Sequence, residues 1–234
     1  MHKTNIEYGD VHWPVWTGCD QPASVCLTQD KCWARRLHNR FHKKWDRWEG
    51  LYKPNFAPRF NEHLLNEPLH LRKPAHILVG FTGDGFGPGT FGLDVERVQE
   101  VVRESPQHTY YFLTKSPDKY RLYNPWPENA WPGATLTGGE PVERQAEIIF
   151  DLRAVEGNRW LSWEPILGPI HKDICMQGID WLVMGAQSGP GAMIPLREWI
   201  DNFWVLKRPQ VSEIWIKNNL LKVFPDLPRI QERP

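Results

Sequence analysis

Short apolar segments recur along the last two-thirds of the chain, and helix-like segments separate them. The expected strands are 76–81 (HILVGF), 109–114 (TYYFLT), 132–137 (PGATLT), 159–163 (RWLSW), 180–185 (DWLVMG) and 212–217 (SEIWIK). Their length and their content of β-branched and aromatic residues are typical of buried strands. Strands that alternate with helices predict βαβ units arranged around a parallel sheet.

Two of the intervening segments have the apolar spacing of helices. They cover 93–105 (LDVERVQEVVRES) and 141–155 (PVERQAEIIFDLRAV). Pro141 opens the second segment, and proline is favoured in the first turn of a helix. The residues of this second helix that we expect to be buried are Ile148, Ile149 and Leu152.

A further short strand near His12–Thr17 would bring the number of parallel strands to six or seven. No dinucleotide-type glycine fingerprint follows this strand, which disfavours a doubly wound sheet. A chain of 234 residues suits one α/β barrel without division into domains. The predicted fold class is therefore α/β, with residues 1–234 forming a single closed or partial β/α barrel.

The composition excludes a strong electrostatic field from the net charge of the whole protein. Lys plus Arg and Asp plus Glu both number 28, so any contact with nucleic acid or a membrane must come from a local patch. The longest apolar runs are about as long as a strand, well short of the roughly 20 residues of a membrane-spanning helix. The first residues, MHKTNIEYGD, lack the apolar core of a signal peptide. These features predict a cytoplasmic protein whose thiols are reduced.

Three of the four cysteines lie in one segment, TGCDQPASVCLTQDKCWARRL, as Cys19, Cys26 and Cys32. Reduced, clustered cysteines are more typical of metal ligands or catalytic groups than of disulfides. Zinc and iron–sulfur clusters both accept thiolates, so the ligand type leaves both open. The loop follows the expected first strand, at the mouth of a barrel, and this position favours a cluster with one open iron over a structural zinc.

A zinc site would need a fourth ligand in addition to the three cysteines. The candidates are His38, His42 and Cys175. Cys175 lies far along the chain, in HKDICMQG, and we expect it to be a buried thiol without a role in the site.

The segment after the cysteines has the pattern of an amphipathic helix over 33–48. Its apolar stripe consists of Trp33, Leu37, Phe41, Trp45 and Trp48. Its other faces carry Arg35, Arg36, Arg40, Lys43, Lys44 and Arg47. This basic face is either solvated or contacts phosphate groups. The cysteine loop thus covers 17–33, and the basic helix with a loop expected to cover the site extends over 33–70.

Thirteen tryptophans are a high number for this length. We expect most of them to fill the core and the rims of a cleft. The alternative, for one or two of them, is stacking on the ring of a substrate.

Polar residues or glycines follow nearly every expected strand. Ligands and catalytic groups of β/α barrels gather at these carboxyl ends, so the pattern predicts an inward-facing site. Alternatively, each residue simply begins a solvated loop. The residues are Thr82, Gly83, Asp84, Thr114, Lys115, Thr137, Gly138, Gly139, Glu140, Glu164, Gln187, Ser188, Lys217 and Asn218.

Several blocks of the sequence, taken together, resemble a three-cysteine family of phage and prokaryotic proteins related to the radical S-adenosylmethionine (SAM) enzymes. The blocks are NIEYGDVHWPVWTGC, CWARRL, LNEPLHLRKPAHILV, SPQHTYYFLTKSPDKY, RWLSWEPILGPI, IDWLVMGAQSGPGA and EIWIKN. They occur in order over most of the chain. The family spaces its cysteines six and then two residues apart, whereas the gaps here are six and then five.

The resemblance implies a 4Fe-4S cluster on Cys19, Cys26 and Cys32 whose open iron chelates SAM. Reduction of the cluster, by an electron donor such as flavodoxin or ferredoxin, would cleave SAM to methionine and a 5′-deoxyadenosyl radical. That radical would abstract a hydrogen atom from a substrate. The cofactors supply this chemistry, and the protein positions them and excludes water.

The resemblance also implies residues that contact SAM. The glycine-rich segment that binds the SAM amino group normally follows the second strand, where this chain has FTGDGF. Thr82 and Asp84 are therefore the candidates for that contact. GGEP at 138–141 looks like the motif, but it follows a later strand, and we interpret this match as fortuitous. The full set of candidate cofactor-binding residues is Thr82, Asp84, Thr114, Glu164, Gln187 and Ser188.

The candidate catalytic residues are Glu164, Lys115 and Lys217. Glu164 contacts the SAM ribose or the substrate, or else is a surface carboxylate. The two lysines hold a carboxylate or phosphate, or else are solvated. Ser188 lies in a glycine turn whose N–H groups either line the pocket or only form the turn.

The leading hypothesis is a radical SAM enzyme, with a nucleoside or a nucleic acid base as the preferred substrate. The alternative is a β/α binding protein stabilised by zinc or by an iron–sulfur cluster, without radical chemistry. A third hypothesis is a hydrolase or lyase that uses Glu164 and Asp84.

Overall fold

The computed structural model describes residues 1–41, 54–90 and 92–234. Its strands are β1 (His2–Lys3), β2 (Val11–Trp13), β3 (Trp16–Thr17), β4 (Arg59–Phe60), β5 (His76–Val79), β6 (Thr109–Thr114), β7 (Ala130–Thr135), β8 (Trp160–Trp163), β9 (Ile179–Met184) and β10 (Val211–Ile216). Its α-helices are α1 (Trp33–Phe41), α2 (Gly92–Glu104), α3 (Val142–Arg153), α4 (Arg197–Leu206) and α5 (Asn218–Val223). Short 3-10 helices lie at Gln29–Lys31, Pro54–Phe56, Glu62–Leu64, Glu67–His70, Pro117–Tyr123 and Arg208–Gln210.

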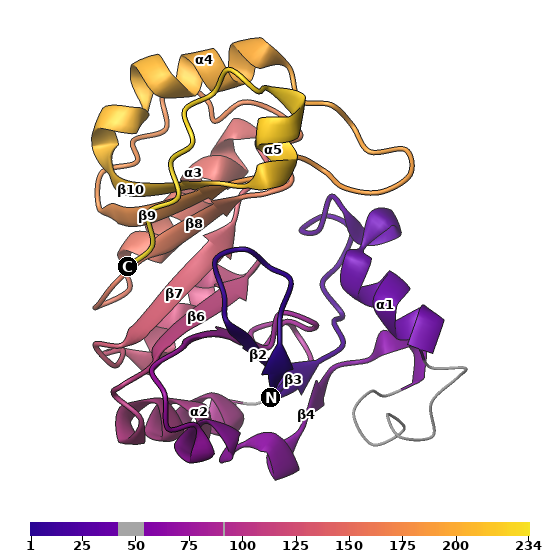
Figure 1. Ribbon diagram of the computed structural model, residues 1–234, viewed down its shortest axis with the longest axis vertical. Coiled ribbons are helices and arrows are strands. Elements are labelled where there is room, and N and C mark those ends of the chain that lie inside the picture. The colour runs from indigo at the N-terminus through magenta and orange to yellow at the C-terminus, as the bar shows by residue number, and fades with distance from the viewer. Residues whose placement is uncertain (42–53, 91) are drawn as a thin grey trace.

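One large sheet organises the chain, with the strand order β1-β2-β5-β6-β7-β8-β9-β10. Every neighbouring pair from β2 to β10 is parallel, and only β1 is antiparallel to its neighbour. This confirms the predicted α/β class and its parallel sheet. The order follows the sequence without reversal, unlike a doubly wound sheet. The sheet is not closed into a barrel, because β1 and β10 lie at opposite edges (Figure 1).

The strand predictions differ from the structure mainly at two places. The predicted strand 132–137 begins two residues earlier, as β7. The predicted first strand is divided at Pro14 and Val15 into β2, which joins the large sheet, and β3, which pairs antiparallel with β4. The backbone N–H of Asn61 donates to the Val15 carbonyl and its side-chain amide donates to the Pro14 carbonyl, both at 2.8 Å. Asn61 therefore provides hydrogen-bond donors for the two carbonyl groups at the break between β2 and β3.

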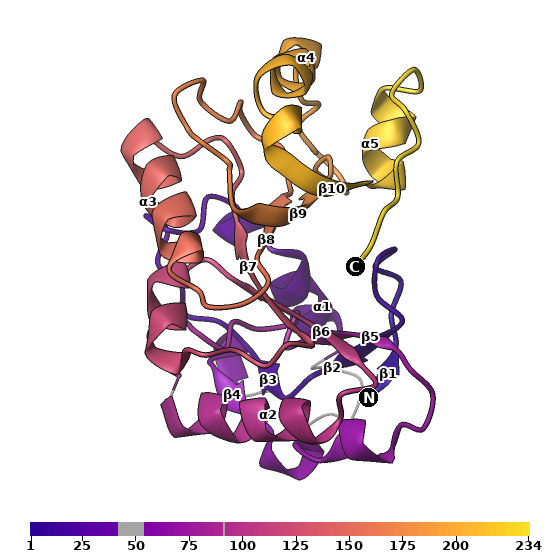
Figure 2. The ribbon, with the colours of Figure 1, turned by 90° about the vertical axis from the view of Figure 1, so that its left-hand side faces the viewer.

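Helices α2, α3 and α4 cover the outer face of the sheet (Figure 2). Alternate side chains of each strand point to this face and pack on the apolar stripes of the helices. Pro141 precedes the first turn of α3 as predicted. The predicted buried residues of that helix are confirmed: Ile148, Ile149 and Leu152 are at most 3% exposed.

The inner face of the sheet carries a cluster of aromatic residues. Figure 1 shows the segment between β1 and β2 crossing this face, and Tyr8 from that segment packs edge-on against Trp160 and Trp181. The Trp160 indole N–H donates to the carbonyls of Phe112 and Trp131, both at 2.8 Å. Packed aromatic side chains thus occupy the inner face over these strands.

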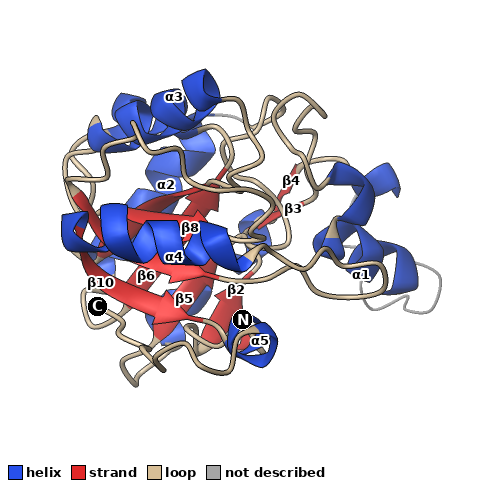
Figure 3. Cartoon of the chain, turned by 90° about the horizontal axis from the view of Figure 1, so that it is seen from above, coloured by secondary structure: helices blue, strands red, loops and turns tan. Residues whose placement is uncertain are grey.

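Helix α1 stands apart from the other helices. Figure 3 shows it on the side of β3 and β4, away from α2, α3 and α4. The predicted helix 33–48 is seen from Trp33 to Phe41, and its remainder, with Trp45 and Trp48, lies outside the described residues. No helix within the described ranges has the length and apolarity needed to cross a membrane.

Candidate functional site

A cleft of about 330 Å³ opens on the inner face, at the carboxyl ends of the parallel strands. Eight of the polar residues and glycines predicted at the strand ends line it, each at or just after the end of a strand or in a loop that follows one: Gly83, Asp84, Thr114, Lys115, Glu164, Gln187, Ser188 and Lys217. All three loop cysteines line the same cleft. Thr82 is 4% exposed and lies just outside this lining. Residues far apart in the sequence therefore meet where the barrel rule places a site.

The cysteine loop begins at a tight contact between Gly18 and the loop after β5. The Gly18 N–H donates to the Thr82 carbonyl at 3.1 Å, and the Gly18 carbonyl accepts from the Asp84 N–H at 3.2 Å. Gly18 has a positive φ of 75°, and a Cβ there would lie 2.1 Å from the Ala57 carbonyl oxygen. Only glycine fits this position without strain. It places Cys19 directly against the cleft.

Each of the three thiols has a polar neighbour. The Gln21 N–H donates to Cys19 Sγ at 3.5 Å, and the Arg35 N–H donates to Cys32 Sγ at 3.5 Å. Cys26 Sγ lies 3.7 Å from the Thr28 hydroxyl. Burial, reinforced by the nearby Asp84 carboxylate, raises the pKa of Cys19 to about 12. The Cys19 thiol is consequently protonated at neutral pH in the metal-free chain.

Asp84 is 5% exposed and connects three segments of the cleft wall. Its Oδ1 accepts from the Thr114 hydroxyl at 2.7 Å and from the Phe86 N–H at 3.0 Å. Its Oδ2 accepts from the Gln21 amide at 2.9 Å and from the Lys115 N–H at 3.3 Å. Asp84 thus joins the cysteine loop to the ends of β5 and β6.

Glu164 and Lys217 form an ion pair across the ends of β8 and β10. Their side chains are 21% and 14% exposed, so the pair is largely shielded from solvent. Lys217 Nζ lies 6.0 Å from the centre of the Tyr8 ring, within the range of a cation–π contact. A Cβ on Gly185 would lie 2.8 Å from the Glu164 carboxyl carbon, so the glycine gives this carboxylate its space.

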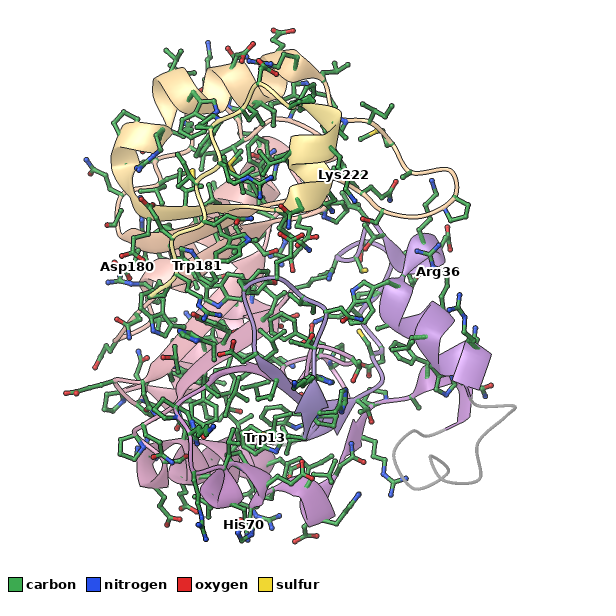
Figure 4. The ribbon with its side chains drawn as sticks, viewed as in Figure 1. Trp13, Arg36, His70, Asp180, Trp181 and Lys222 are labelled. Carbon is green, nitrogen blue, oxygen red and sulfur yellow. The ribbon has the colours of Figure 1, made fainter. Side chains whose placement is uncertain are left out.

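The loop after β9 reaches across the cleft to the cysteine side. The Lys31 ammonium donates to the Gly191 carbonyl at 2.7 Å. The Arg36 guanidinium lies 3.4 Å from the ideal Cβ position of Gly189, and Figure 4 shows Arg36 on the part of α1 nearest that loop. Asn219 of α5 donates to the Ser188 hydroxyl at 3.1 Å and holds the other end of the turn.

The GGEP segment has a different role from the one that its resemblance to a SAM-binding motif suggests. The Glu140 carboxylate accepts from the Thr137 N–H at 3.0 Å and from the Thr137 hydroxyl at 2.8 Å. Residues 138–141 do not line the cleft. FTGDGF, in contrast, follows the second parallel strand of the sheet, as expected.

Several residues of the cleft were not predicted as part of the site. Tyr8, Lys31, Trp33 and Arg36 line it, and Gln21 supports it through Asp84; of these, only Trp33 and Arg36 had been named, as residues of the amphipathic helix. Lys31, Trp33 and Arg36 lie within four residues of Cys32 in the sequence. This closeness to a proposed ligand could have indicated that they belong to the site. Tyr8 had no comparable signal, because its place follows from the path of the N-terminal segment over the sheet.

Two of the three proposed fourth zinc ligands lie in the part of the chain that the structure describes. The prediction that Cys175 is buried is wrong: this thiol is exposed, on a loop of the outer side whose backbone is held by Arg153. His38 is buried beside Phe56, and His42 lies outside the described residues. Among the described residues, no three His, Cys, Asp or Glu side chains form a group able to hold a single metal ion.

Comparison with known sequences places the chain in a family. A profile of the family described as "Protein of unknown function (DUF5131)" matches residues 3–209. The chain belongs to this family. The match includes the cysteine loop, Asp84 and Glu164 but ends before Lys217. No curated protein and no solved structure gave a significant match. The family description names no activity, so the chemistry of the cleft has to indicate the function.

Proposed function

We propose that this protein is a radical SAM-type enzyme whose Cys19, Cys26 and Cys32 bind a 4Fe-4S cluster. One observation carries the proposal: three cysteines of a single loop line one cleft together with the polar residues that follow the parallel strands. The open parallel sheet, with its site at the carboxyl ends of the strands, is consistent with a partial β/α barrel of the radical SAM kind.

The donor set fits the cluster. Thiolates are the usual ligands of iron–sulfur clusters, and hydrogen bonds to the sulfurs tune them. Backbone N–H groups already point at Cys19 and Cys32. A cluster takes one thiolate on each of three irons, so its ligands need not converge on a single point. When bound, the cluster and SAM would supply a 5′-deoxyadenosyl radical for hydrogen abstraction.

The residues of this chain have separate roles in the proposal. Glu164, which is paired with Lys217, would accept hydrogen bonds from the hydroxyl groups of a ribose or a substrate. Lys115 and Lys217 are placed to bind an anionic group. Thr114, Gln187 and Ser188 offer further polar contacts along the wall, and Thr82 lies just behind it.

Asp84 is the candidate for binding the SAM amino group. Its two oxygens already accept four donors, which matches the capacity of a carboxylate. An ammonium would therefore replace one of them, and the Gln21 amide is the one side-chain donor that comes from the cysteine loop itself. Tyr8 and Phe81 form an apolar floor that helps to exclude water from the reaction.

Anaerobic reconstitution with iron and sulfide tests the proposal. We expect a brown protein that contains bound iron and sulfide and that releases 5′-deoxyadenosine from SAM under reductant. Cys19→Ala, Cys26→Ala and Cys32→Ala should each abolish both properties. Cys175→Ala is the matched control and should retain them, because this thiol lies outside the cleft.

Two outcomes would contradict the proposal. A colourless protein that retains zinc would instead indicate the zinc-stabilised binding protein. Retention of activity by all three loop variants would favour a hydrolase or lyase that uses Glu164 and Asp84.

A further inference from the structure

The rim of the cleft carries one exposed tryptophan. Trp33, the first residue of α1, is 49% exposed and lines the cleft. In contrast, Trp13, Trp160, Trp163 and Trp181 are fully buried. A large flat ring held at the entrance of a cleft is available to stack on a planar group of a ligand.

Positive charge continues from the cleft along α1. Arg36 and Arg40 are both exposed and lie one helical turn apart, about 6 Å along the axis. The helix contains no Asp or Glu between Trp33 and Phe41. Among the described residues, no carboxylate forms a salt bridge with either arginine. These two guanidinium groups therefore remain available to anions.

Charges inside the cleft reinforce this asymmetry. Its acidic residues are Asp84, which accepts four hydrogen bonds, and Glu164, which is paired with Lys217. Lys31 and Lys115 also line the cleft and have no carboxylate partner among the described residues. A cleft with an excess of unpaired cations favours an anionic ligand.

We propose that the mouth of the cleft binds a single strand of nucleic acid. Trp33 stacks on a base, Arg36 and Arg40 contact successive phosphates, and an adjacent base enters the cleft. Stacking on aromatic rings combined with a basic track is the usual mode of single-strand binding. The proposal rests on the proposed function in that it names the substrate class of the same cleft.

A polymer fits this surface better than a free nucleotide. A mononucleotide would reach Trp33 and the lysines of the cleft, whereas Arg40 lies two turns along α1 from the entrance. A duplex fits less well, because an enzyme that modifies a base must first remove that base from the stack. An acidic electron-donor protein would need the arginines but would have no particular use for an aromatic ring at the rim of a concave cleft.

Fluorescence anisotropy with a labelled single-stranded oligonucleotide of about 12 nucleotides tests the proposal. The wild-type protein should bind it with a salt dependence, and Arg36→Gln and Arg40→Gln should each weaken binding and reduce the slope of log K against log salt by about 0.7. Trp33→Leu should raise Kd about 5- to 100-fold, the equivalent of a lost base stack, without changing this slope.

The matched control is Arg72→Gln. Arg72 is exposed and precedes β5, at the amino ends of the strands and hence opposite the cleft. This variant removes the same charge and should bind like wild type. Equal weakening by Arg72→Gln, tighter binding of a duplex of the same sequence, or an unchanged Kd in Trp33→Leu would overturn the proposal. Binding of reduced flavodoxin through Arg36 and Arg40, with no oligonucleotide binding, would assign the surface to a protein partner instead.

The experiment is run with both the metal-free and the reconstituted protein, so its outcome is independent of the cluster. If the protein binds the oligonucleotide but acquires no cluster on reconstitution, the proposed function is refuted and this inference stands. If the protein forms a functional cluster but does not bind the oligonucleotide, this inference is refuted and the proposed function stands.

Discussion

Replacement of Asp84 by alanine is expected to destabilise the fold by about 3–5 kcal/mol, since it removes a buried acceptor with four donors. The donors are the side chains of Gln21 and Thr114 and the backbone N–H groups of Phe86 and Lys115. They belong to the cysteine loop and to the segments that follow β5 and β6. The loss should therefore loosen the whole cysteine side of the cleft.

The magnitude follows from which donors can find new partners. The Gln21 amide and the Thr114 hydroxyl can rotate, and Gln21 already has a second acceptor in the Ser116 hydroxyl at 2.8 Å. The two backbone N–H groups are fixed, and each buried donor left without an acceptor costs about 1–3 kcal/mol. Asp84→Asn keeps the shape and one carbonyl oxygen, so it should cost about 1–3 kcal/mol.

Urea denaturation of the metal-free protein measures both changes in the free energy of unfolding. Asp118→Ala is the control, because Asp118 is an exposed aspartate in the 3-10 helix after β6. A surface substitution of this kind should stay within about 0.5 kcal/mol of wild type. A loss below about 1 kcal/mol for Asp84→Ala would refute the reasoning that this carboxylate organises the cleft wall.

Three further predictions follow from other parts of the structure. Cys175 is exposed and its pKa is lowered by the Gln177 N–H and Arg153, so peptide mapping should show it alkylated first and Cys19 last. Burial, aided by His2, lowers the pKa of His12 to about 3, so the unfolded chain binds more protons below its ordinary pKa of 6.5. The free energy of unfolding should consequently fall by up to about 2 kcal/mol from pH 7 to pH 5 through this group, and urea titrations of His12→Gln should show a weaker pH dependence. Gly185→Ala should displace the Glu164 carboxylate and lower stability by about 1–3 kcal/mol in the same assay, and unchanged stability would contradict the close packing.

The parallel sheet could be predicted because its strands are buried and their apolar runs are continuous. TYYFLT is the clearest case, since the predicted strand and β6 have the same bounds. The rule that sites lie at the carboxyl ends of parallel strands then placed Lys115, Glu164 and Lys217 in one cleft, although about 50 residues separate each from the next.

Other features depend on contacts that no local pattern encodes. The pairing of β3 with β4 relies on Asn61, which binds backbone groups 46 and 47 residues away. The exposure of Cys175 depends on the path of its loop over the outside of the protein, whereas the usual burial of free cysteines led to the opposite prediction. For GGEP, its position after a later strand already indicated a fortuitous match, and Glu140 binds its own turn and lies outside the cleft lining.

The electron paramagnetic resonance spectrum of the reduced, reconstituted protein tests the cluster proposal most directly. We predict the signal of a reduced 4Fe-4S cluster whose shape changes when SAM is added, and no such signal in Cys26→Ala. Zinc in place of iron, a signal insensitive to SAM, or an unchanged signal in Cys26→Ala would contradict the assignment of the three cysteines as ligands of a SAM-binding cluster.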